Sequence, residues 1–397
     1  MALNDYKVAY DNSYEEVFNK VLVAKSIANM RYEPMLTYGG SVVRFTYDSS
    51  AVRVRTVSRG SASTIDTITD STESLTINLE KEAVFYISDG EVKQTGPLNP
   101  GEVIGGQIAI KVATDLDARV LAEILNAYQT FDDGDLTTSA STGTGITLSS
   151  TTVPQMVTRM PAKLKAINIL TTDMAFVVDP YMAADLEQYL LGKQFDIVNS
   201  IWKNGYSGAI AMAEVYVSNN LPFTAVLTAT GSLAAGDVVT IGSVAFTGVT
   251  GSVGTTAGNF LVGVSVAADL GTLAALINTP GTTTAGGVAL SAANQAILTD
   301  DYKLSASVAA SAMTITSLGG GRLTTAETSA STSWGSRWTH AYYGKKGAID
   351  LVVQDISSVD MRETADRRGT NVFSSYLAGL KTFADGAKKF LDVRIVV

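Results

Sequence analysis

The sequence predicts an α+β protein that carries an additional, inserted β-rich domain. Three observations support this: residues 100–128 place apolar side chains at helical spacing, the flanking segments alternate with a period of two, and residues 223–333 are mostly Ala, Gly, Thr, Ser and Val. A chain of 397 residues is too long for one simple core, so we expect two or three domains.

The composition excludes several classes of function. A formal net charge of −9 argues against a protein that binds nucleic acid by neutralising phosphates, although enclosing DNA requires no affinity for it. The absence of cysteine removes disulfides, thiolate metal sites and cysteine nucleophiles. The first residues lack a signal-peptide pattern, and no apolar run reaches about 18 residues, so we expect a protein made in the cytoplasm without a membrane span.

The first 90 residues predict an N-terminal arm with a helix (1–36) and an extended β-hairpin loop (37–90). The helix has an apolar face formed by Val17, Val21 and Ala24, and Pro34 ends it. In the hairpin, residues 42–47 and 52–57 alternate around a turn at 48–50, and further strands are expected at 75–79 and 83–87.

The hairpin concentrates positive charge in an otherwise acidic chain. Its arginines are Arg44, Arg53, Arg55 and Arg59. Two interpretations stay open at this point: the arginines form the solvated face of a hairpin, or they pair with acidic patches on an adjacent subunit.

Residues 91–152 contain the longest predicted helix. Pro100 and Glu102 suit its first turn, and at about 1.5 Å per residue the helix would be roughly 40 Å long. One stripe holds Ile104, Ile108, Val112, Leu116, Val120, Ile124 and Tyr128. It is either an ordinary core helix or a spine against which other elements lie. Residues 135–152 are rich in Thr, Ser and Gly and predict a surface loop or a weakly ordered linker.

Residues 153–221 predict short, mixed α/β elements. Helices are expected at 153–165 and 180–191, the second with Asp179 as its N-cap, and strands at 174–178 and 213–218 around a turn at 205–208.

Residues 222–333 and 334–397 differ sharply. The first segment predicts short strands separated by Gly and Thr turns, with only 270–277 helical, and therefore an inserted all-β sandwich or barrel. The second returns to α/β, with strands at 348–353 and 390–397 around a charged loop at 360–369. This loop contributes Arg362, Arg367 and Arg368.

The sequence offers little chemistry. His340 is the only histidine, which leaves no pair of histidines for acid–base relay, and we expect it to be structural. The glycine clusters, including 319–321, match neither the phosphate-loop nor the dinucleotide pattern. We therefore expect no catalytic, cofactor-binding or metal-binding residues, no cofactor, and no enzymatic activity.

The order of these parts resembles the major capsid (coat) proteins of tailed bacteriophages with the Hong Kong 97 fold. The resemblance covers 1–221 and 334–397 and includes "FVVDPYMAADLEQYL" and "NGYSGAIAMAEVYVSNNLP"; "VSNNLP" is its most specific piece. The insertion, with "AVLTATGSLAAGDVVTIGSVAFTG", is similar to the extra β-rich domain of some coat proteins. No functional residue transfers with certainty.

The resemblance implies a function for each region. Residues 37–90 would form a loop over a neighbouring subunit, 91–152 a peripheral domain with the spine helix, and 153–221 with 334–397 an axial domain around five- and six-fold axes. The insertion (222–333) would project from the outer surface. The seven arginines named above are the candidate inter-subunit contacts.

The implied function is a structural subunit that self-assembles, as hexamers and pentamers, into an icosahedral virion shell. The shell would be assembled in the host cytoplasm, with a separate scaffolding protein, a portal and decoration proteins as partners, and would enclose double-stranded DNA without sequence-specific binding. The alternatives are a phage tail or decoration protein and a cellular encapsulin-type compartment shell. Capsid size, host and covalent cross-linking are not specified by the sequence.

Overall fold

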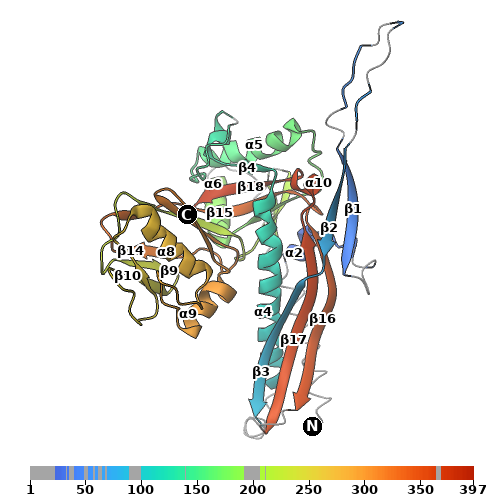
Figure 1. Cartoon of the computed structure of the whole chain (residues 1–397). Helices are drawn as coiled ribbons and strands as arrows, with labels where there is room; N and C mark the ends of the chain where they lie inside the picture. Colours follow the sequence, from blue (N-terminus) through green and yellow to red (C-terminus); the bar gives the residue numbers. More distant parts are fainter. Residues whose placement is uncertain are drawn as a thin grey trace. The chain divides into compact units, whose positions relative to one another are not determined.

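The computed structural model describes residues 23–32, 34, 40–48, 52–56, 59–60, 65–67, 69–88, 100–138, 140–191, 206–210, 212–363 and 368–397. The chain divides into two compact units (Figure 1). Among the described residues, unit 1 takes its members from Asn29–Val112 and Ile349–Phe383, and unit 2 takes them from Phe18–Ala28, Ala113–Ala348 and Ala384–Val397.

Unit 1 contains an antiparallel strand pair, β1 (Ser41–Asp48) and β2 (Thr69–Thr76). The predicted pairing of 42–47 with 52–57 is wrong, because residues 52–56 form no strand and lie in the connection between β1 and β2. Side-chain bonds to Asp66 replace a backbone ladder in this connection: the Arg53 amide donates to Asp66 over 2.9 Å.

The second sheet of unit 1 joins segments that are far apart in the chain. Its order is β16 (Asp350–Glu363), β17 (Gly369–Lys381), β3 (Leu79–Ser88), and all pairs are antiparallel. The sequence analysis grouped 334–397 with 153–221, but β16 and β17 belong with β3 in unit 1. The expected charged loop at 360–369 is shorter than predicted, because β16 continues to Glu363 and β17 begins at Gly369.

The long helix α4 spans Pro100–Ala122 and continues as a 3-10 turn, Glu123–Asn126. Its predicted stripe is buried at Val112, Leu116, Val120 and Ile124, each 6% exposed or less. Tyr128, the last predicted member, is 63% exposed because the helix has already ended. The spacing therefore predicted the helix correctly and extended it too far.

Unit 2 is built on a nine-stranded mixed sheet. Its main path is β12-β13-β8-β15-β5-β7-β6, and β18 pairs with β15 and with β4. The strands are β4 (Gln129–Phe131), β5 (Met174–Val178), β6 (Tyr206–Ile210), β7 (Ala213–Val217), β8 (Phe223–Ala229), β12 (Ser305–Ala309), β13 (Ala312–Ser317), β15 (Thr332–Lys345) and β18 (Phe390–Val396). The turn predicted at 205–208 is wrong, because β6 begins at Tyr206.

Strand β15 connects the two halves of this sheet. One edge pairs with β8 over Thr332–Thr339 and then with β5 over Tyr342–Lys345, while the opposite edge pairs with β18. The predicted boundary between 333 and 334 therefore falls inside a strand. Independent folding of 222–333 stays a prediction.

A four-stranded sheet completes the 222–333 segment. Its order is β11 (Asn259–Leu261), β10 (Val244–Val249), β9 (Val238–Ile241), β14 (Thr325–Glu327). The predicted helix is present and longer, as α8 (Val266–Asn278), and Phe246, Phe260 and Leu273 lie in the core with it. The all-β assignment is wrong, because α9 (Ala292–Ala296) and a π-helical turn (Ile297–Asp301) follow.

Two predicted helices lie in unit 2 as expected, α5 (Thr152–Ala166) and α6 (Pro180–Leu191). The Asp179 carboxylate accepts the Met182 amide over 2.6 Å, which satisfies an amide of the first turn of α6. The shorter helical segments of unit 2 are α2 (Ala24–Ile27), Asp133–Leu136 and α10 (Ala384–Ala387). The helix predicted in the N-terminal arm ends earlier than expected, because α2 stops at Ile27, with Ala28 extended, rather than at Pro34; residues 1–22 of the arm lie outside the described residues.

Candidate subunit-contact surface

The connection between β1 and β2 exposes apolar side chains. Val52, Val54 and Ile65 are 49%, 105% and 89% exposed. The described residues 52–56 and 65–67 lie beyond the ends of both strands (Figure 1). We call these residues the β1–β2 loop. Its apolar side chains leave a surface that water solvates poorly.

A bidentate ion pair holds the β1–β2 loop together. The Arg55 guanidinium contacts both carboxylate oxygens of Asp66, at 2.7 and 2.8 Å, and the Arg53 amide donates to the same carboxylate. The Arg55 bonds, with the Arg53 amide, lower the pKa of Asp66 below its ordinary value. Asp66 thus fixes the two sides of the loop to each other, a role that the sequence analysis missed because the partners are not adjacent in sequence.

The other predicted contact residues are distributed over unit 1. Arg44 is half-buried on β1, with its guanidinium 5.2 Å from the centre of the Phe383 ring. Arg59 lies exposed in a turn, and Arg368 is exposed beside the start of β17. For Arg362 only the backbone, in β16, is described, and Arg367 lies outside the described residues.

Among the described members of this set, Arg53 and Arg55 meet at one acceptor, Asp66. The Arg368 carbonyl oxygen accepts the Tyr86 hydroxyl over 2.6 Å, so this contact involves its backbone rather than its charge. Arg53 and Arg55 thus form one group in the loop, whereas Arg368 contacts β3 through its backbone.

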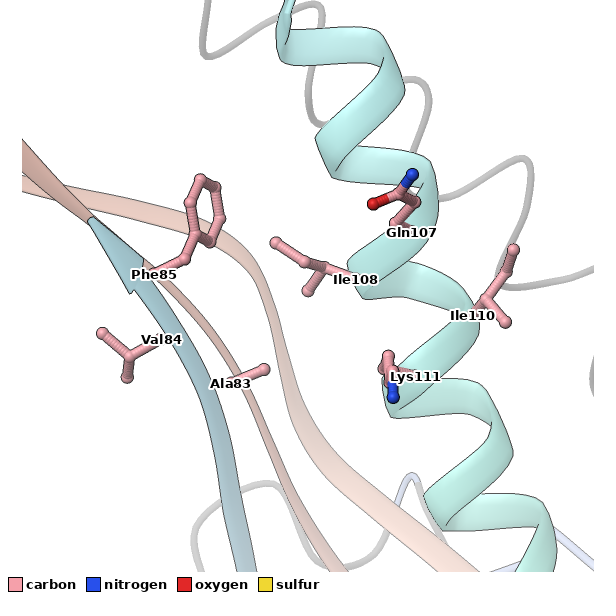
Figure 2. Close-up of a pocket in the computed structure, with 7 residues that line it drawn as sticks. All are labelled: Ala83, Val84, Phe85, Gln107, Ile108, Ile110 and Lys111. Carbon is pink, nitrogen blue, oxygen red and sulfur yellow. The ribbon is translucent and has the colours of Figure 1, made fainter. Parts of the chain in front are cut away.

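An apolar groove of about 510 Å³ lies between β3 and α4 in unit 1 (Figure 2). Phe85 from β3 and Ile108 from α4 point toward one another, as Figure 2 shows. The lining residues are Ala83, Val84, Phe85, Gln107, Ile108, Ile110 and Lys111.

The walls of this groove keep apolar surface in contact with water. Phe85 and Ile108, which face one another across the groove, are only half-buried, whereas Val84 (48% exposed) and Ile110 (46% exposed) point away from it in Figure 2. The alternation at 83–87 predicted a strand but did not indicate that one of its faces would lie beside α4, because that requires knowledge of tertiary contacts.

The hydrogen-bond partners of His340 are of the kind found in a catalytic proton relay, but all three side chains are buried. Its Nδ1 lies 2.7 Å from an Asp392 carboxylate oxygen, and its Nε2 lies 2.8 Å from the Thr224 hydroxyl. Thr224, His340 and Asp392 are 5%, 3% and 3% exposed. The hydroxyl is therefore covered, and the three side chains link strands β8, β15 and β18.

Two further features bear on alternative chemistry. Within the described part of the chain, no group of three or more His, Cys, Asp or Glu side chains is placed to hold a metal ion. No described helix is both long enough and apolar enough to cross a membrane.

Comparisons with known proteins give structural likenesses only. No protein-family model matches the chain, and no curated protein matches it. Among solved structures it is similar to one of Mycobacterium phage Che8, with 13% identity, coverage of 93% of this chain and 90% of that chain, and a TM-score of 0.49.

Two phage capsid structures are similar to the same degree. The capsid of Cyanophage P-SCSP1u shares 12% identity over 94% of this chain and 88% of that chain, with a TM-score of 0.48. The mature capsid of bacteriophage PhiM1 shares 11% identity over 90% and 82%, with a TM-score of 0.43. At TM-scores below 0.5 these likenesses carry no argument about this chain.

Proposed function

We propose that the chain is a structural shell subunit with a Hong Kong 97-type capsid fold, which self-assembles into an icosahedral shell around double-stranded phage DNA. The β1–β2 loop carries this proposal. Val54 and Ile65 are almost fully exposed on a loop whose two sides are held together by Arg55 and Asp66. A loop that is ordered before binding loses less conformational entropy when it contacts another molecule.

The energy of one such contact is modest. Burying a Val or Ile side chain fully contributes about 1.5–3 kcal/mol, and association costs several kcal/mol of lost freedom of motion. A closed symmetric shell repeats the same contact at every subunit, so that weak contacts together stabilise a large assembly. This reasoning favours self-assembly over a single isolated contact.

The proposed receiving surface is the β3–α4 groove of a second copy. Its apolar walls, Phe85 and Ile108, match the apolar side chains of the loop. One copy thus offers both halves of a head-to-tail contact, which forms rings or extended lattices.

The order of elements supports the fold assignment within this proposal. A strand pair with a long connection, the helix α4, the mixed sheet around β5 and β7, and the terminal strand β18 follow one another as in the resemblance above. In this assignment 222–333 is the inserted domain, on the outer surface. The proposed partners are a scaffolding protein, a portal and decoration proteins, and the proposed location is the virion, after assembly in the host cytoplasm.

The test is negative-stain electron microscopy with light scattering on the purified chain and on Val54→Asp. The wild type is expected to form rings, tubes or closed shells. A carboxylate in place of Val54 would have to be buried against an apolar groove, so assembly should fall at least about tenfold. Leu170→Asp provides a control, because Leu170 is 74% exposed in unit 2.

The proposal fails if the wild type stays monomeric at every concentration tested, or if Val54→Asp assembles as well as the wild type. Equal impairment by Leu170→Asp would show that any new surface charge opposes assembly and would remove the assignment to the loop.

A further inference from the structure

A buried carboxylate on α4, Asp117, joins two separate segments of unit 2. Asp117 is 0% exposed. It accepts the Ala24 amide over 2.6 Å and also the Val23 amide, at the start of α2. It accepts the Ser218 hydroxyl over 3.0 Å and the Asn220 side-chain amide over 3.2 Å, in the turn after β7. One side chain therefore contacts both segments.

The donors around Asp117 that the structure shows are all neutral. A buried carboxylate without a paired cation depends on hydrogen bonds to compensate for lost hydration. Burial raises the pKa of Asp117, and the bonds from Ala24, Asn220, Ser218 and Val23 oppose this effect. Each of these bonds therefore favours the ionised form of the Asp117 carboxylate.

The two segments differ in how else they are held. The turn after β7 is fixed independently, because the Ser218 amide donates to the Val178 carbonyl at the end of β5. The α2 segment is only four residues long, and the buried Ala24 and Ile27 side chains and the bond from the Gly347 amide to the Ile27 carbonyl also hold it. Asp117 supplies the acceptor for both amides at its start.

We propose that Asp117 is a latch that anchors the chain at residues 23–24 to unit 2, so that loss of its carboxylate releases this segment while the sheet of unit 2 stays intact. The latch thus fixes the position of residues 23–24 in unit 2. This inference does not depend on the proposed function, because it concerns one copy of the chain.

The test compares Asp117→Ala with Asp115→Ala on the same helix. Asp115 is a matched control, because its carboxylate pairs with Arg119 at 3.0 Å and with Lys303 at 2.8 Å. Alanine suits a helix interior, so α4 should persist in both variants. The measurement is amide hydrogen exchange of a peptide covering 23–28, together with the rate of trypsin cleavage after Lys25.

In Asp117→Ala, exchange at 23–28 and cleavage after Lys25 are expected to accelerate about tenfold or more, because the Val23 amide and the buried Ala24 amide lose a charged acceptor. Exchange in β5 should not change. Asp117→Asn, which retains the size and one acceptor oxygen, should give a smaller acceleration and serves as the test if the alanine variant does not fold. Unchanged exchange at 23–28 in the folded Asp117 variants, or equal acceleration in Asp115→Ala, would overturn the latch.

Discussion

The β1–β2 loop and the interior of unit 2 use charged side chains in opposite ways. In the loop, the Arg55–Asp66 pair lies at the surface and holds apolar side chains out in water. In unit 2, Asp117 and Asp132 are fully buried and accept several bonds each, while the apolar side chains around them are covered. In the interior, Asp117 and Asp132 therefore find their hydrogen-bond donors within the same chain. The loop leaves the apolar side chains of Val52, Val54 and Ile65 exposed.

The buried groups of unit 2 are therefore expected to determine the stability of the single chain, and the β1–β2 loop is expected to determine association between chains. Substitutions in the buried part of α4 or at Asp132 should lower the free energy of unfolding of the single chain. Substitutions in the loop should leave the single chain folded and change only its association. The expected effects on the stability of the single chain decrease from Val120→Asp to Arg55→Ala.

Val120→Asp should have the largest effect. Val120 is 0% exposed on α4, and an unpaired carboxylate there should lower the free energy of unfolding by about 3–5 kcal/mol and abolish soluble assembly. Ile110→Asp on the same helix is the matched control, because Ile110 is 46% exposed and should cost about 1 kcal/mol or less. Denaturant unfolding measures both. Equal stability of the two variants would contradict the burial of the α4 stripe.

Asp132→Ala should have an intermediate effect, confined to one loop. The Asp132 carboxylate accepts the amides of Gly134, Thr142 and Gly143 and the Ser141 hydroxyl. Losing these bonds to a buried carboxylate should cost about 1.5–3 kcal/mol and accelerate hydrogen exchange at 141–144. Asp133→Ala provides the control, because Asp133 is exposed beside it. If both variants exchange alike, Asp132 does not organise the loop.

The same site predicts a pH dependence. Burial opposes ionisation of Asp132, but the bonds from Ser141, Thr142, Gly143 and Gly134 outweigh burial and lower its pKa below 3.8. The folded state thus binds the proton less tightly than the unfolded state. Its contribution to stability is present above pH 3.8 and is lost as the pH falls through the lowered pKa. Protection of 141–144 that is constant down to pH 2 would contradict this.

Arg55→Ala should have the smallest effect on the folded chain and a clear effect on association. The denaturation midpoint should not change measurably, because the pair is solvent-exposed. Exchange at 52–56 should accelerate, because the Arg55–Asp66 bonds are lost. Assembly, followed by light scattering, should weaken because the loop must then be ordered on binding. A drop in the denaturation midpoint comparable to that of Val120→Asp would show that the loop is part of the core.

Local pattern predicted the elements that depend on neighbouring residues. The spacing of Val112, Leu116 and Val120 predicted α4, and Asp179 before Pro180 predicted the start of α6. In each case the signal and its structural effect lie within a few residues of each other. The α+β class followed from the same signals.

Pairing between distant segments could not be predicted in this way. The partner of β1 is β2 rather than 52–57, and the partner of β3 is β17, because strand pairing depends on contacts that sequence periodicity does not specify. Residues 140–144 are rich in Ser, Thr and Gly, and their composition suggested a weakly ordered linker. Asp132 organises them through bonds to three of their number.

The candidate site was predicted in part. Arg53 and Arg55 were identified from charge alone, but their common acceptor, Asp66, lies beyond a stretch without periodicity. The groove between β3 and α4 needs both elements in place before its apolar walls can be seen. The arginines thus identified the β1–β2 loop from the sequence. The common acceptor of Arg53 and Arg55 and the apolar groove could be identified only in the folded structure.

Site-specific photo-crosslinking from residue 54 tests the central claim most directly. A photoreactive amino acid replaces Val54, and mass spectrometry maps the attachment points under conditions where the chain associates. The account predicts cross-links between two copies, with attachment in 83–85 and 107–111. Cross-links confined to one chain in associated material would contradict the claim that the β1–β2 loop is covered by a second copy.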